Sequence, residues 1–321
     1  NAATRKTHSQ LNRLILERIP HALPPHTSDP SIYVSGLLHI ASIYINFEGL
    51  WNDILESPKS SSKCSSNGPF SAYYDWGSLS NSVVNPISPN IDMPSPNQIP
   101  TVCSRIEYIL RLLRIPDLLR AEVIVADIQN LTFLPKHKTL EKIEAVTKAG
   151  ALFEFLAHTK NSVNENPQVL VAYSWVLYMA LFSGGRYLRA LLIDAGGSGA
   201  KFWSNQFLPN SLHNVLPDTS KSSISQSNIN GSTKELVSTP RFSAKYQTSK
   251  ENLGLQLFHF SGDADGEDLK LEFKKRMLEA DSLLTDSEKM DVILEAQNIF
   301  KFMIKIVRDL DILMEKQRGV N

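Results

Sequence analysis

One segment, residues 167–197, limits what this chain can fold into more than any other part of the sequence. Between residues 169 and 182 only Ser174 and two tyrosines carry polar groups, so the segment is apolar around its whole circumference. A membrane span needs roughly 20 apolar residues, and this run ends earlier, at Gly184 and Gly185. The segment is therefore predicted to be a buried core helix rather than a helix in a bilayer.

The two adjacent glycines are unusual inside a helical pattern. Each costs about 1 kcal/mol relative to alanine, and helices bend at such pairs. Because glycine has no Cβ, a bent Gly184–Gly185 backbone can lie directly against a flat ligand. The alternative is that another helix crosses closely at this point. The spacing alone leaves both explanations open.

Composition excludes some classes of function and predicts a location. The 321 residues are 42% hydrophobic and 21% charged, with 33 basic and 33 acidic residues, so no positive field would attract nucleic acid. Cys64 and Cys103 lie in or beside a Ser/Pro-rich stretch and form neither a metal-ligand cluster nor a disulfide framework. We expect an intracellular protein, cytoplasmic or on the cytoplasmic face of a membrane. The start at Asn1 suggests a fragment or processed form, and no membrane anchor is visible in the chain.

Helical periodicity dominates the remaining sequence, and no convincing alternating strand occurs. The fold class predicted is therefore all-α, a single multi-helical domain over residues 1–321 with two long insertions. The insertions are residues 57–101 and 208–250, which are rich in Ser, Asn or Pro and too polar to pack. Helices are predicted at residues 2–19, 30–55, 103–114, 116–131, 139–160, 268–284 and 285–315. Thr285 and Glu288 form a predicted capping box at the start of the last helix.

His8 shares the three- and four-residue spacing of Leu11, Leu14 and Ile15, so it is predicted to face inward from the first helix. A single histidine on an apolar helix face is commonly a core residue. It is also the commonest metal-binding side chain. Periodicity does not choose between these two roles.

With these elements placed, the chain resembles the heme oxygenase family over most of its length, excluding the two insertions. The segment from Ala3 to His8 is similar to the first helix of the family, and residues 166–185 are similar to its distal helix, whose signature ends in Gly-Asp-Leu-Ser-Gly-Gly. Three further blocks, residues 257–260, 270–277 and 295–300, match the closing portion in order.

The resemblance implies a heme-binding protein of multi-helical fold. It implies that His8 is the proximal ligand of the heme iron and that Ser183, Gly184 and Gly185 lie over the porphyrin. The family positions that pair with the heme propionates are Arg5, Lys270 and Lys274, and Asn1 occupies a position where the family usually has lysine. The family's activity is oxidative cleavage of heme to biliverdin, iron and carbon monoxide with electrons from a reductase.

The sequence departs from the family pattern at the distal side. Leu181 stands where the family has an aspartate that holds a distal water network. Family partners of that aspartate, an arginine, a tyrosine and an asparagine, align with Leu177, Phe47 and Met303. Four polar groups are thus replaced by apolar ones. Because distal polarity separates oxygen activation from mere binding, this predicts impaired turnover.

Two functions follow from these observations. The first is an active heme oxygenase, and the second is a catalytically impaired heme binder, sensor or scaffold. A third candidate, a helical hydrolase of thiamine-type ligands, would need a cysteine in its pocket, and both cysteines belong to the first insertion or its flank.

Overall fold

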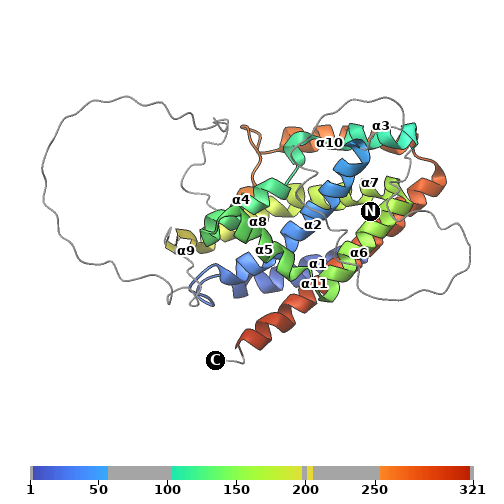
Figure 1. Cartoon of the computed structure of the whole chain (residues 1–321). Coiled ribbons are helices and arrows are strands. Elements are labelled where there is room, and N and C mark those ends of the chain that lie inside the picture. The colour runs from blue at the N-terminus through green and yellow to red at the C-terminus, as the bar shows by residue number, and fades with distance from the viewer. Residues whose placement is uncertain (1–2, 57–102, 197–200, 205–253, 319–321) are drawn as a thin grey trace, which may run out of the picture.

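The computed structural model describes residues 3–56, 103–196, 201–204 and 254–318 (Figure 1). Its helices are α1 (Arg5–Arg18), α2 (Ser31–Glu56), α3 (Ser104–Leu113), α4 (Ala121–Thr132), α5 (Lys136–Val146), α6 (Gly150–Glu165), α7 (Leu170–Ala180), α8 (Arg186–Gly196), α9 (Lys201–Ser204), α10 (Glu267–Leu283) and α11 (Asp286–Arg318). Short 3-10 turns are η1 (Ile19–Ala22), η3 (Pro116–Leu118), η4 (Pro167–Val169) and η8 (Gln256–Phe258), and η5 (Leu181–Gly185) is a π-helical turn. No strand occurs in these ranges, and the predicted all-α class is confirmed.

Both predicted insertions fall entirely outside the described residues, so their character and the single-domain prediction remain predictions. Asn1 and Cys64 also lie outside this part of the chain. Cys103 is exposed and immediately precedes α3.

Helix α2 supplies the middle of the core and contacts α4, α5 and α6 (Figure 1). Its aromatic residues pack inward: Phe47 and Trp51 are fully buried, and the Trp51 indole donates a hydrogen bond to the Leu110 carbonyl at 3.2 Å. A buried carboxylate, Glu48, accepts hydrogen bonds from the backbone amides of Arg120 at 2.8 Å and Ala121 at 3.0 Å. Glu48 therefore caps the first turn of α4, whose amides have no partners within the helix. Burial raises the pKa of Glu48.

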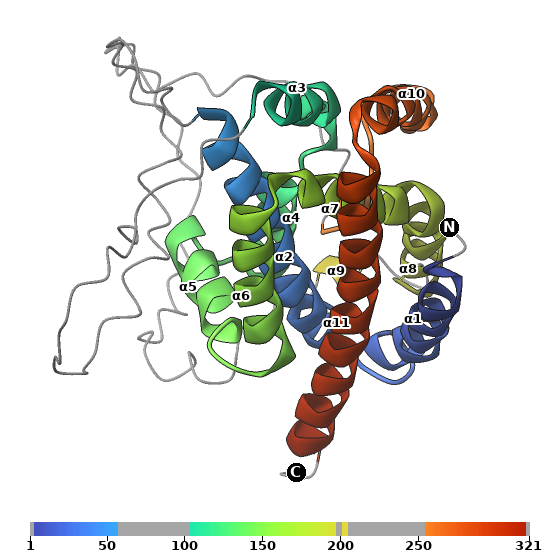
Figure 2. The ribbon, with the colours of Figure 1, turned by 90° about the vertical axis from the view of Figure 1, so that its right-hand side faces the viewer.

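Helix α7 carries the apolar run that limits the fold, and eight of its 11 residues are buried. It passes behind α11 in Figure 2, and the two helices are in contact. The longer segment Pro167–Asp194 is long and apolar enough to cross a membrane, yet 67% of its most apolar window is buried inside the fold. Such burial is typical of a core helix, as the sequence predicts.

The chain does not form one helix over residues 139–160, and that prediction is wrong. Helix α5 ends at Val146 and α6 begins at Gly150, which has a positive φ of 75°. Asp309 of α11 accepts a hydrogen bond from the Ala151 amide at 2.7 Å and thereby caps α6. A left-handed glycine, together with a cap from a distant helix, is what divides the segment.

Helices α10 and α11 form the closing portion, and α11 runs along α1, α6 and α7 (Figure 2). The predicted capping box is confirmed: Glu288 accepts a hydrogen bond from the Thr285 amide at 2.8 Å, and the Glu288 amide donates to the Thr285 hydroxyl at 3.3 Å. Arg105 of α3 also pairs with Glu288 at 2.7 Å, which attaches the start of α11 to α3.

Candidate functional site

The two glycines of η5 have different surroundings. A Cβ placed on Gly185 would lie 3.1 Å from the Phe258 ring and 3.7 Å from the Leu181 Cβ, so a side chain here would require the ring to shift. A Cβ on Gly184 would meet nothing within 4 Å. The packing partner at Gly185 is thus the Phe258 side chain of the short 3-10 turn η8. Gly184 presents bare backbone to open space, and Ser183 beside it is exposed.

The π-helical turn lies at the glycine pair. Such turns appear within α-helices mainly as single-turn bulges, frequently at functional sites. The sequence predicts a bend at the glycine pair, and the structure confirms an irregular turn at Leu181–Gly185. Leu181, at the start of this turn, is buried in the core, whereas the backbone of Gly184 faces open space.

Hydrogen bonds between α4 and the backbone of η8 hold Phe258 in its position against Gly185. Asp127 of α4 accepts hydrogen bonds from the amides of Gln256 at 3.0 Å and Leu257 at 2.7 Å. This carboxyl group is fully buried, and burial raises its pKa to about 7. Arg189 of α8 donates a further hydrogen bond to the Phe258 carbonyl at 3.2 Å. Asp127 is a site-supporting residue that sequence periodicity did not reveal.

His8 lies on α1, and its predicted inward orientation is wrong, because the residue is exposed. Leu11 is the one buried residue of α1. The His8 ring makes an edge contact with Phe300 of α11, with ring centroids 5.5 Å apart. Within the described residues, neither ring nitrogen of His8 has a hydrogen-bond partner. The imidazole is therefore accessible to a ligand. Arg5, one turn earlier on the same helix, is also exposed.

The apolar positions predicted for the distal side are all buried in one hydrophobic cluster. They are Phe47, Leu177, Leu181 and Met303, with exposed fractions of 0%, 6%, 5% and 8%. Phe47 is the innermost: its ring lies 5.5 Å from that of Tyr44 and 6.3 Å from that of Tyr173.

Tyr44 is a polar residue next to these positions that sequence reasoning missed. Its hydroxyl donates a hydrogen bond to the Leu177 carbonyl at 3.0 Å, and burial raises its pKa. The signal was its place one helical turn before Phe47. Because its proton is directed at a carbonyl, the hydroxyl leaves the apolar character of the Leu177 side chain unchanged.

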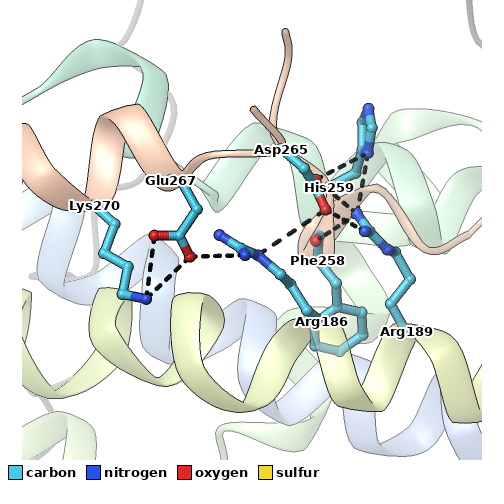
Figure 3. A network of polar contacts seen from close by, with 7 residues as sticks. All are labelled: Arg186, Arg189, Phe258, His259, Asp265, Glu267 and Lys270. Atoms are coloured by element: carbon cyan, nitrogen blue, oxygen red, sulfur yellow. Dashed lines mark hydrogen bonds and ion pairs between the residues drawn. The ribbon is translucent and has the colours of Figure 1, made fainter. Parts of the chain in front are cut away.

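A network of charged side chains lies between α8 and the start of α10 (Figure 3). Arg186 pairs with Glu267 at 2.8 Å, and Lys270 pairs with the same carboxylate at 3.1 Å. Arg189 pairs with Asp265, which lies 3.7 Å from His259. Lys270 and then Arg186 lower the pKa of Glu267, and Arg189 lowers that of Asp265.

The structure thus brings Lys270, one of the predicted propionate partners, into contact with residues that the sequence did not single out. Lys274 is exposed on the same helix. Arg186 follows Gly185 directly, so the network adjoins the π-helical turn. Two arginines three residues apart, directly after the glycine pair, were the available signal.

A comparison with known protein families covers the part of the chain that holds the π-helical turn and the charged cluster. A sequence model of heme oxygenase matches residues 104–309. The chain belongs to the heme oxygenase family. The predicted resemblance is confirmed by this match. It covers the π-helical turn, the basic residues and Met303, and leaves His8, Arg5 and Phe47 outside.

The chain is also similar to a curated protein. The heme-binding protein HMX1 of Saccharomyces cerevisiae is 26% identical over 215 residues, which are 65% of this chain and 55% of that protein. The chain therefore spans about half the length of the curated relative that it matches.

Proposed function

We propose that this chain binds heme, which the backbone of η5 and the imidazole of His8 would hold, with His8 as the ligand of the iron. The observation that carries the proposal is the bare backbone of Gly184, which faces open space while Gly185 is packed against Phe258. The exposed imidazole of His8 and the apolar side chains behind η5 are of the kind that hold a flat apolar cofactor. Family membership and the printed name of the yeast relative support the same ligand.

We further propose that Arg5, Lys270 and Lys274 pair with the two propionates. These cations lie on α1 and α10, and a charge-assisted contact to a carboxylate is stronger than a neutral hydrogen bond. An intracellular location and a reductase as electron donor are part of this proposal. Their support is the cysteine usage of the chain and the chemistry of the family.

When bound, heme supplies the redox-active iron for an oxidative ring opening, and the protein must supply protons on the distal side. Leu177, Leu181 and Met303 offer no donor there, and the nearby Tyr44 hydroxyl is directed at a carbonyl. A dry apolar wall holds heme well but moves no proton. We therefore propose that the chain is primarily a heme binder with impaired oxygenase activity.

A hemin titration followed by a single-turnover assay tests both parts. The full chain should bind one equivalent of hemin with a sharp Soret band. With a reductant and oxygen, it should form biliverdin about 10²–10⁴ times more slowly than an active heme oxygenase measured in parallel, the range that a general acid typically contributes. Failure to bind hemin would overturn the binding proposal. Rapid biliverdin formation would overturn only the impaired-turnover proposal.

Substitution of Leu181 separates a missing donor from a badly shaped pocket. Leu181→Asp should recover part of the rate, and adding Leu177→Arg should recover more, because a buried carboxylate without a partner stays neutral. Leu181→Ala is the matched control, since it removes the same apolar bulk without adding a proton donor. Equal acceleration by Leu181→Ala would show that side-chain volume limits the reaction.

A further inference from the structure

Two cations share one carboxylate beside the π-helical turn. The Glu267 carboxylate is 2.8 Å from Arg186 and 3.1 Å from Lys270 (Figure 3). The three side chains are only partly exposed, at 29% for Arg186, 45% for Glu267 and 22% for Lys270. With two positive charges and one negative, the cluster has a net charge of +1. It is therefore able to attract a second anion.

Arg186 has unused hydrogen-bonding capacity. It pairs with Glu267 through Nη1, whereas its Nε and Nη2 atoms are buried and have no hydrogen-bond acceptor among the described residues. The closest ion-pair partner of Nε is Asp265, whose oxygen is 4.0 Å away, beyond hydrogen-bond distance. Buried donors without acceptors are rare and costly. A guanidinium group can bind a planar carboxylate through two parallel hydrogen bonds once its donors are exposed to it.

We propose that Glu267 is an internal counter-ion of the ligand site. In the ligand-free protein it holds Arg186 and Lys270, and a carboxylate of the ligand competes with it for these two cations. Arg186 becomes a carboxylate-binding residue in addition to those that the family resemblance implies. This inference rests on the proposed binding of heme, whose two propionates are the carboxylates concerned.

The position of Arg186 supports this assignment. It is the residue directly after Gly185 and begins α8, so the charged cluster adjoins the π-helical turn in the chain. Lys270 lies one turn after Glu267 on α10, whereas Arg186 lies on α8, so the two cations come from different helices. A carboxylate that joins them would link α8 to α10, as Glu267 does now.

The experiment is a hemin titration of the full chain with Glu267→Gln, which keeps the size of the side chain and removes its charge. Hemin affinity should rise about three- to fivefold at low ionic strength, as expected for loss of one partly exposed competing charge. The gain should shrink at high salt. Hemin dimethyl ester, which lacks free carboxylates, should bind the variant and the unmutated chain equally.

Glu272→Gln is the matched control. Glu272 lies on the same helix, pairs with Arg276 at 2.7 Å and is 42% exposed, so its substitution changes the net charge of α10 by the same amount away from the cluster. It should leave hemin affinity unchanged. Arg186→Gln should weaken hemin binding, and Glu267→Gln should gain less in that background than in the unmutated chain.

The outcomes distinguish this inference from the proposed function. If the unmutated chain binds neither hemin nor its ester, both fail. If hemin binds but Glu267→Gln leaves the affinity unchanged or weakens it, only the counter-ion role is overturned. An equal gain with Glu272→Gln would also overturn it, because general charge rather than this pairing would then explain the effect.

Discussion

Substitution of Gly184 by alanine should raise the stability of the ligand-free protein and weaken heme binding. The new methyl group would extend about 1.5 Å from the backbone into space where, apart from the chain neighbours and the helix's own backbone, no atom of the described residues lies within 4 Å. Without a clash, the usual helical preference for alanine over glycine should raise the free energy of unfolding by about 0.5–1 kcal/mol. The same methyl group would hold a porphyrin off the backbone. If that misfit costs about 1–3 kcal/mol, hemin affinity should fall about 5- to 150-fold.

Urea denaturation of the ligand-free protein and a Soret titration of the same preparation measure the two effects. Gly185→Ala is the control, because its methyl group would press on the Phe258 ring at 3.1 Å and require that ring to move. Gly185→Ala should therefore be less stable than Gly184→Ala. If Gly184→Ala is more stable and binds hemin as tightly as the unmutated chain, the porphyrin does not lie on this backbone. The proposed orientation would then be wrong.

Three further substitutions test separate parts of the structure. His8→Ala should shift and weaken the Soret band of bound hemin while changing the free energy of unfolding by less than about 0.5 kcal/mol, because the residue is exposed; an unchanged spectrum would remove His8 as the iron ligand. Asp127 keeps its proton in the folded state up to about pH 7 but loses it near pH 4 when unfolded, so its contribution to stability should fall as the pH rises between these values. Asp127→Asn should flatten this dependence in urea midpoints taken at pH 5 and 7.5, and should cost about 1–3 kcal/mol at pH 5 because the Leu257 amide loses its acceptor; an unaltered slope would contradict the assignment. The pKa of Glu288 is shifted in the opposite direction, because Arg105 lowers it to about 2. The contribution of Glu288 to stability is therefore present above about pH 4.5 and is lost as the pH falls towards 2. Glu288→Gln should remove this dependence at acid pH and lower the free energy of unfolding by about 1 kcal/mol at neutral pH. Acid titration of both proteins, followed by circular dichroism, measures the effect, and identical denaturation of the two would contradict this role of Glu288.

The sequence alone determined the helical class, the buried character of α7, the bend at the glycine pair and the capping box at Thr285. These features depend on residues within a few positions of each other, so periodicity and local hydrogen bonding are sufficient to specify them. It also carried enough family signature in residues 166–185 and the closing blocks to indicate the heme oxygenase family.

Local pattern failed where a distant residue decides the outcome. The division between α5 and α6 depends on Asp309 of α11, which caps α6 from another part of the chain. The inward placement of His8 was wrong because α1 buries only Leu11 fully, and periodicity gives a direction but not the depth of packing.

The tertiary structure alone decided which glycine has which role and which groups surround the site. Gly184 and Gly185 are chemically identical. Phe258, whose segment is held by Asp127, packs against Gly185 and leaves Gly184 uncovered. The pairing of Arg186 with Glu267 likewise joins residues far apart in the chain. Charges at such separations meet only after the helices pack, because Coulomb energy depends on distance in space and not on distance in sequence.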